Sequence, residues 1–300
     1  MKISIVTDEI SADPETAIEL GVEWGVRDFE IRGFFSDRAP RLSPYQKRHL
    51  HDLLAEHEAR IIAVGPGLFK MACPLPRPPR LPLAWMEQNA HDTWAASRHA
   101  ADQHLNELLP ASLDFAHEFS AQLVVIFGFD RAGAPPGSPP DEMLDWLRRA
   151  AERAGAAGIQ LALENEDGFW ADTGARTAGI VRAVNHPALG VNWDPGNAFF
   201  AGDEPYPDGY RQVRGLVRHV HFKDARRDKA GLPCYAVDGQ IDWPGQLQAL
   251  AADGYDGWIS IETHMRPKVR AGRASLERLS GLVNAAQANA PKLTERRTTT

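Results

Sequence analysis

Four ionisable residues in the second half of the chain each close a segment in which apolar and small or polar residues alternate. They are Glu164, Asp194, His221 and Glu262. Because side chains on a strand point alternately to its two faces, these four groups would share one side of their strands. If the strands are neighbours in a parallel sheet, the groups meet at its carboxyl edge. Two glutamates, an aspartate and a histidine suit a hard divalent metal ion.

Each of these residues has an ordinary interpretation when it is taken alone. A carboxylate at a strand end is commonly a helix cap or a surface charge, and a histidine on a strand is commonly a hydrogen-bonded core residue. The combination is harder to explain in this way, because burying three carboxylates together is costly or forces protonation. A divalent cation removes that cost. We therefore predict one bound ion, with Mn²⁺, Mg²⁺, Co²⁺ and Zn²⁺ left open.

Eight strand-like segments alternate with helical patterns along the chain. The predicted strands are residues 3–6, 28–32, 60–64, 122–127, 159–164, 189–194, 218–221 and 258–262. The predicted helices are residues 13–20, 44–58, 85–119, 140–154, 174–184, 210–217, 243–251 and 274–288. Such alternation is typical of parallel strands joined by crossover helices. Eight units in 300 residues predict an α/β fold, a single (β/α)8 TIM barrel with a parallel eight-stranded core.

An open, doubly wound sheet is the competing fold. It usually carries a glycine-rich phosphate loop after its first strand, whereas this chain has Thr7-Asp8-Glu9-Ile10 there. No domain boundary is evident, so we expect one catalytic domain over residues 1–290 and a disordered tail over residues 291–300. The proline-rich stretch 73–82 follows the third strand, and we interpret it as a lid on the catalytic face.

Composition and charge restrict the classes of partner. The net charge of -7 disfavours nucleic acid and anionic membranes. The only two cysteines, Cys73 and Cys234, cannot form a disulfide scaffold. A strand begins directly after Met1 without a signal peptide, and no run approaches the ~20 apolar residues that span a bilayer. We therefore expect a cytoplasmic protein, with the choice between monomer and homo-oligomer left open.

Several motifs resemble the xylose isomerase-like family of sugar phosphate isomerases and epimerases. They are Leu163-Glu164-Asn165, Asn192-Trp193-Asp194-Pro195-Gly196-Asn197, His219-Val220-His221-Phe222-Lys223-Asp224, and the segments 238–244 and 254–262. The resemblance covers nearly the whole chain. It implies that Glu164, Asp194, His221 and Glu262 are the metal ligands, that the two glutamates are the catalytic acid and base, and that the substrate is a sugar or a cyclitol.

The predicted ligand set supports one kind of chemistry. A hydroxy-ketone can bind a metal ion through its carbonyl and adjacent hydroxyl oxygens, which stabilises the enediolate formed when the neighbouring carbon loses a proton. One glutamate would take that proton and the other would return one from the opposite face. We therefore expect a metal-dependent isomerase or epimerase. In the alternative, the enediolate expels a β-hydroxyl group, and the enzyme is a dehydratase of an inosose or of a dehydroshikimate-type acid. Inosose dehydratases resemble this chain in residues 219–224.

Two further classes of function are less well supported by the sequence. An apurinic-site endonuclease would need additional metal ligands on the second to fourth strands and a basic face, whereas the third and fourth strands offer Ile62, Val64, Val124 and Ile126. A non-catalytic sugar-binding barrel would be expected to have lost a ligand, and all four are present. These points favour an enzyme.

Five residues are candidate contacts to the substrate: Glu30, Arg32, Asn197, His219 and Lys223. Glu30 and Arg32 face inward on the second strand, and Lys223 follows the predicted histidine ligand; each could bind the substrate or form an internal salt bridge. His219 lies ~6.6 Å deeper along its strand, where a supporting or core role is equally suitable. Asn197 stands where epimerases of this family often carry a substrate-contacting histidine, which counts against a close epimerase assignment.

Overall fold

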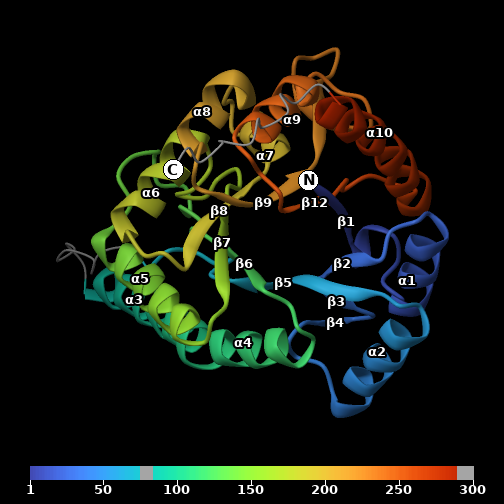
Figure 1. Cartoon of the computed structure of the whole chain (residues 1–300). Coiled ribbons are helices and arrows are strands. Elements are labelled where there is room, and N and C mark those ends of the chain that lie inside the picture. Colours follow the sequence, from blue (N-terminus) through green and yellow to red (C-terminus); the bar gives the residue numbers. More distant parts are fainter. Residues whose placement is uncertain (75–83, 289–300) are drawn as a thin grey trace, which may run out of the picture.

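Eight parallel strands close on themselves in the computed structural model of the protein, which describes residues 1–74 and 84–288 (Figure 1). The strands are β1 (Lys2–Val6), β2 (Asp28–Ile31), β5 (Arg60–Leu68), β6 (Leu123–Phe127), β7 (Gln160–Glu164), β8 (Leu189–Trp193), β9 (Val217–Phe222) and β12 (Trp258–Ile261). Each strand pairs with the next in chain order, and β12 pairs with β1 to close the barrel. The predicted TIM barrel is confirmed, and the open sheet is excluded.

Helices surround the barrel, and all except the last connect successive strands of the barrel (Figure 1). They are α1 (Pro14–Glu23), α2 (Pro44–Glu56), α3 (Ala84–Gln103), α4 (Leu109–Glu118), α5 (Asp141–Ala156), α6 (Gly174–Val184), α8 (Tyr210–Val213), α9 (Trp243–Ala252) and α10 (Lys268–Ala288). Asp13 caps α1, because its Oδ1 accepts the backbone N–H of Glu15 at 3.1 Å and Pro14 occupies the first helical position.

Two predicted helix boundaries are wrong. The segment expected to be helical over residues 210–217 leaves the helix after Val213, because Arg214 has an extended backbone that leads into β9. The last helix begins at Lys268, six residues before the predicted start at residue 274. Propensity alone sets such boundaries poorly.

The barrel interior below the site is filled by a small apolar layer. Ile62, Ala63, Leu123, Val125 and Ala162 form this cluster, separate from the main core between strands and helices. Val64, Val124 and Ile126, which were expected to face inward, belong instead to the main core, and Ala63, Leu123 and Val125 take the inward positions. The substitutes are still apolar, so neither strand adds a metal ligand here.

Three short elements follow the carboxyl ends of the strands, and the sequence did not predict them. The hairpin β3 (Gly33–Phe34) and β4 (Asp37–Arg38) follows β2, and the hairpin β10 (Asp224–Arg227) and β11 (Pro233–Ala236) follows β9. Helix α7 (Pro195–Phe200) follows β8. Elements of two to six residues show too little periodicity to be found by pattern.

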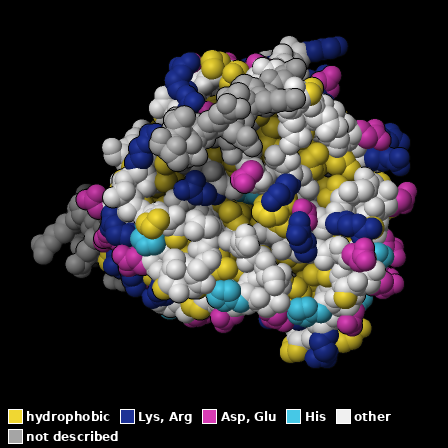
Figure 2. Space-filling model, in the orientation of Figure 1, with side chains coloured by type: hydrophobic (Ala, Val, Ile, Leu, Met, Phe, Trp, Pro, Cys, Tyr) yellow, Lys and Arg dark blue, Asp and Glu magenta, His cyan; other side chains and the backbone are white. Residues whose placement is uncertain are grey.

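The predicted lid over residues 73–82 is described only at Cys73 and Pro74, and the predicted tail over residues 291–300 lies outside the described residues. None of the helices in the described ranges is long and apolar enough to cross a bilayer. On the face seen in Figure 2, acidic and basic side chains intermingle.

Candidate active site

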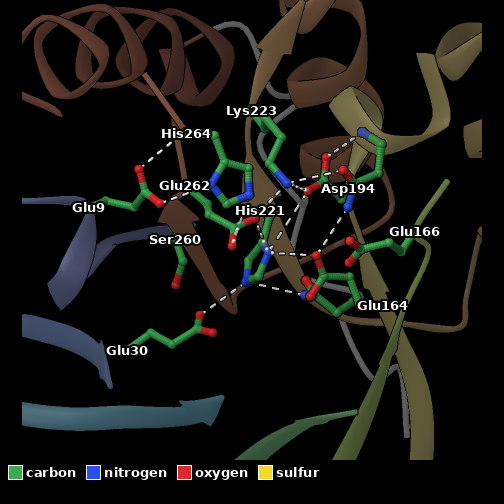
Figure 3. Close-up of polar contacts among 12 residues, drawn as sticks. Glu9, Glu30, Glu164, Glu166, Asp194, His221, Lys223, Ser260, Glu262 and His264 are labelled. Carbon is green, nitrogen blue, oxygen red and sulfur yellow. Dashed lines mark hydrogen bonds and ion pairs between the residues drawn. The ribbon is translucent and has the colours of Figure 1, made fainter. Parts of the chain in front are cut away.

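Glu164, Asp194, His221 and Glu262 converge at the carboxyl end of the barrel (Figure 3). One potential ligand atom from each lies within 4.8 Å of the others. Glu164 and His221 belong to β7 and β9, while Asp194 and Glu262 directly follow β8 and β12. All four side chains are buried. The structure thus brings together the four residues whose strand positions pointed to one edge.

His221 lies at the centre of this group. Its Nδ1 is 3.4 Å from Oε1 of Glu164, 3.3 Å from Oε2 of Glu262 and 4.0 Å from Oδ2 of Asp194. Its Nε2 points the other way, to Oε2 of Glu30 at 3.1 Å. One ring nitrogen therefore faces the carboxylates of the site, and the other faces the buried Glu30.

Glu30 and His219 lie beneath His221, deeper in the barrel. Oε2 of Glu30 is 3.0 Å from Nε2 of His219, which also lies 3.0 Å from the hydroxyl of Ser260. Both side chains are at most 2% exposed. Burial raises the pKa of Glu30, but the two histidines outweigh it and hold that pKa well below its usual value. These contacts orient His221.

Lys223 is inserted between two of the carboxylates. Its Nζ lies 2.7 Å from Oδ2 of Asp194, 2.6 Å from Oε2 of Glu262 and 3.1 Å from Oδ1 of Asn197. Helix α7 packs closely against it, since a Cβ on Gly196 would meet Cγ and the carbonyl oxygen of Lys223 at 2.7 Å. Burial lowers the pKa of Lys223, but the surrounding carboxylates raise it well above its usual value.

Arg32 is fully engaged by three carboxylates at the other side of the group. Its Nε and Nη2 each lie 3.0 Å from a carboxylate oxygen of Asp8, its Nη2 donates to Oε1 of Glu9 at 2.9 Å, and its Nη1 donates to Oε1 of Glu262. Glu9 also accepts from the hydroxyl of Thr263. Arg32 therefore holds Glu262 in place and has little capacity left for a substrate.

Asp8 and Glu9 were not among the residues singled out from the sequence. They lie in the 3-10 turn Thr7–Glu9 that follows β1, so a search for ionisable residues at strand ends, as at Glu164, could have found them. The run Thr7-Asp8-Glu9 was considered only as evidence against a phosphate loop. His264 also reaches this cluster, with Nδ1 at 3.1 Å from Oε1 of Glu9 and Nε2 at 3.6 Å from Oε1 of Glu262.

The two glutamates of the group have different surroundings. Oε1 of Glu164 accepts from the neutral amide of Asn197 at 3.1 Å. Glu262 instead contacts two permanent cations, Arg32 and Lys223. Burial raises the pKa of Glu262, but Lys223, His221 and Arg32 lower it well below its usual value. Glu262 is therefore the weaker base of the two.

The group fits a divalent ion on chemical grounds. Nδ1 of His221 is buried and has no hydrogen-bond partner among the described residues, while Oδ2 of Asp194 and Oε2 of Glu262, also buried, meet only the ammonium of Lys223. Buried polar atoms are normally satisfied, so an unpaired Nδ1 that faces three buried carboxylates is typical of a metal-ligand set. Burial and the neighbouring glutamates raise the pKa of Asp194 to about 6 despite Lys223, which marks a region where carboxylates repel one another.

Comparison with known proteins agrees with this architecture. An inosose dehydratase of Lacticaseibacillus casei is 24% identical over 183 residues, which are 51% of this chain and 61% of that protein. The chain therefore spans about three fifths of that curated relative. A xylose isomerase domain protein from Planctomyces limnophilus has a TM-score of 0.69 at 16% identity, covering 96% of this chain and 98% of the other. An L-ribulose 3-epimerase has a TM-score of 0.68 at 15% identity and full coverage of both chains.

Both structures are similar to this chain in fold. A family model described as "Xylose isomerase-like TIM barrel" matches residues 18–281, which is most of the sequence. The barrel topology agrees with that match, since it has eight strands in sequential order with the ionisable group at their carboxyl ends. The chain belongs to the xylose isomerase-like TIM barrel family.

Proposed function

We propose that the protein is a divalent-metal-dependent enzyme that removes a proton from the carbon next to the carbonyl of a polyhydroxy ketone. The convergence of four buried ligand-type side chains, with Nδ1 of His221 unpaired among them, carries this proposal. Glu164, Asp194, His221 and Glu262 would hold the ion, for which Mn²⁺ is the first choice and Mg²⁺, Co²⁺ and Zn²⁺ are alternatives. When bound, the ion would polarise the carbonyl oxygen and stabilise the negative charge that develops on it.

Glu164 is the better proton acceptor. Its nearest hydrogen-bond donor is the neutral amide of Asn197, whereas Arg32 and Lys223 both stabilise the ionised form of Glu262. Glu164 therefore takes the substrate proton. A bound ion would replace Lys223 as the partner of Asp194 and Glu262, so that its ammonium group could donate to an oxygen of the substrate, while Arg32 keeps Glu262 oriented.

Loss of a β-hydroxyl group after proton removal would make the enzyme a dehydratase, and return of the proton would make it an isomerase or epimerase. An epimerase needs two groups of comparable basicity on opposite faces of one carbon, and the two glutamates here are unequal. Several curated relatives of this chain are named inosose dehydratases, at 22–27% identity. We therefore place dehydration first and isomerisation second, which reverses the order expected from the sequence.

The test is a product assay on the metal-loaded protein with ketoses, inososes and 3-dehydroshikimate as substrates. A dehydratase releases water and leaves an unsaturated, ultraviolet-absorbing product, whereas an isomerase in deuterium oxide incorporates deuterium next to the carbonyl. Glu164→Gln should abolish either signal, while the exposed Glu152→Gln on α5 should leave it intact. Absence of both signals for every substrate class, with the ion bound, would point to a non-catalytic sugar-binding barrel.

A further inference from the structure

Arg38 ends the short β3–β4 hairpin, which lies beside the carboxyl end of β5 (Figure 1). Its Nε donates to the carbonyl oxygen of Gly65 at 2.9 Å. Its guanidinium lies across Gly67, where a Cβ would meet Cζ and Nε at 3.3 Å and Nη2 at 3.5 Å. Gly67 has a φ of +76°, so the absence of a side chain allows both this backbone conformation and the close approach of Arg38. The end of β5 thus fixes one edge of the guanidinium.

The same stretch of backbone borders the candidate active site. A Cβ on Gly65 would lie 3.5 Å from both Cβ of Arg32 and Oε1 of Glu30, so Gly65 separates Arg38 from two residues of the site. Burial and repulsion by Arg32 lower the pKa of Arg38, while the charges of Asp8, Glu164 and Glu262 oppose that change. The guanidinium is therefore within electrostatic range of the proposed metal ligands.

Arg38 differs from Arg32, Lys223 and Lys70 in having no carboxylate partner among the described residues. Arg32 pairs with Asp8, Glu9 and Glu262, and Lys223 pairs with Asp194 and Glu262. Lys70 pairs with Glu166 at 2.8 Å.

Within residues 1–74 and 84–288, Arg38 forms no ion pair, and its only side-chain hydrogen bond uses Nε. Its two terminal nitrogens, on a partly buried and permanently charged group, remain free to bind an anion.

We propose that the terminal nitrogens of Arg38 bind a carboxylate or phosphate group of the substrate, so that the substrate is a polyhydroxy keto acid or a phosphorylated ketose and not a neutral sugar. This inference rests on the function proposed above, whose site it extends. A guanidinium presents two parallel N–H donors that match the paired oxygens of either group. Arg32 is less suited to this role, because each of its three nitrogens already donates to a carboxylate.

Calorimetric titration of the Mn²⁺-loaded protein with three probes tests the inference. The probes are shikimate, a cyclic polyol with a carboxylate; glucose 6-phosphate; and myo-inositol, a neutral cyclic polyol. Wild type should bind one charged probe about 10- to 100-fold more tightly than myo-inositol, the range of a charge-assisted hydrogen-bonded pair. The probe that binds identifies the group as a carboxylate or a phosphate.

Two substitutions at Arg38 and one control locate the preference. Arg38→Gln should lose the preference for the charged probe, because its affinity for that probe falls while its affinity for myo-inositol stays within about twofold of wild type. Arg38→Lys should retain part of it, because the charge stays and the fork geometry is lost. Arg41→Gln makes the same charge change at an exposed position three residues away and should behave as wild type.

Equal affinities of wild type for charged and neutral probes, no binding of either charged probe, or the same loss in Arg41→Gln would overturn the inference. Thermal melting establishes that each variant is folded, and Arg38→Lys supplies the comparison if Arg38→Gln is unstable. The Mn²⁺ affinity of Arg38→Gln should equal that of wild type. If wild type binds no Mn²⁺, the proposed function fails, whereas the anion preference is still measured in the same titrations without metal.

Discussion

Nε2 of His221 lies 3.1 Å from Oε2 of Glu30, and this contact decides which ring nitrogen faces the candidate active site. A carboxylate can only accept a hydrogen bond, so Nε2 carries a proton, and in the neutral ring that binds a metal ion the lone pair is on Nδ1. Nδ1 is the atom that faces Glu164 and Glu262. A buried carboxylate behind the ring thus prepares the histidine to bind a metal ion.

Replacing Glu30 should therefore weaken metal binding without removing a ligand. Glu30→Gln can present an amide N–H to Nε2, which favours the wrong tautomer of His221, and should lower Mn²⁺ affinity about 10- to 100-fold by calorimetry. Ser260→Ala is the matched control, because it removes a hydrogen bond to His219 and leaves the contact between Glu30 and His221. Equal affinities of wild type and Glu30→Gln would contradict this role.

Metal removal should lower the melting temperature of the wild-type protein. An ion that binds only the folded state at 100 times its dissociation constant adds about 2.7 kcal/mol of stability. Asp194→Ala should abolish most of the difference between chelated and Mn²⁺-loaded protein, whereas the exposed Asp208→Asn should preserve it. Differential scanning calorimetry checks this, and a wild-type melting temperature that is indifferent to verified metal removal would count against a dedicated site.

The two glutamates should respond differently to the same substitution. Glu164→Gln keeps an oxygen ligand and removes the proposed base, so turnover should fall by about 10²–10⁴ while metal affinity falls modestly. Glu262→Gln should reduce turnover less than Glu164→Gln does, because Arg32 and Lys223 already disfavour its protonation. His221→Gln exchanges one neutral ligand for another and should retain more activity than Glu164→Gln. Wild-type rates in both metal-loaded glutamate variants would mean that the base lies elsewhere.

Acid stability should depend on Glu9. Burial and Glu262 raise the pKa of Glu9, but the hydrogen bond to His264 and the charges of His264 and Arg32 lower it to about 2 from 4.5. Because the folded-state pKa is the lower one, this stabilisation is complete above pH ~4.5 and disappears as the pH falls toward 2; it amounts to at most about 3 kcal/mol.

Denaturant unfolding of Glu9→Gln at several pH values measures that contribution. The variant should be less stable than wild type at pH 6, and the difference should shrink between pH 4.5 and pH 2. The exposed Glu23→Gln on α1 should follow the wild-type pH dependence. A constant difference between Glu9→Gln and wild type across this range would show that the carboxylate charge is not the source of the stability.

The sequence predicted the barrel and the central group for the same reason. Strand side chains alternate strictly, so the positions of Glu164, Asp194, His221 and Glu262 at strand ends were enough to place them at one edge. No distant contact had to be known. Gln122–Phe127 was predicted with the wrong inward phase, because a fully apolar strand gives no alternation to read.

What the sequence could not predict depends on contacts between segments far apart in the chain. Arg38 lies in a two-residue strand, and its place beside the site depends on the carbonyl oxygen of Gly65. The position of Lys223 depends on α7, whose Gly196 allows the close approach. Arg32 was expected to be a substrate contact or a salt bridge, and only the structure shows how many carboxylates it meets.

Anomalous diffraction from crystals of the Mn²⁺-loaded protein tests the central claim most directly. We predict a single manganese peak between β7, β8, β9 and β12, with Nδ1 of His221 and carboxylate oxygens of Glu164, Asp194 and Glu262 at ~2.0–2.6 Å. The same data should show Lys223 moved away from the point between Asp194 and Glu262. No peak at this position under saturating Mn²⁺, or a peak held by other residues while Lys223 still bridges the two carboxylates, would contradict the account.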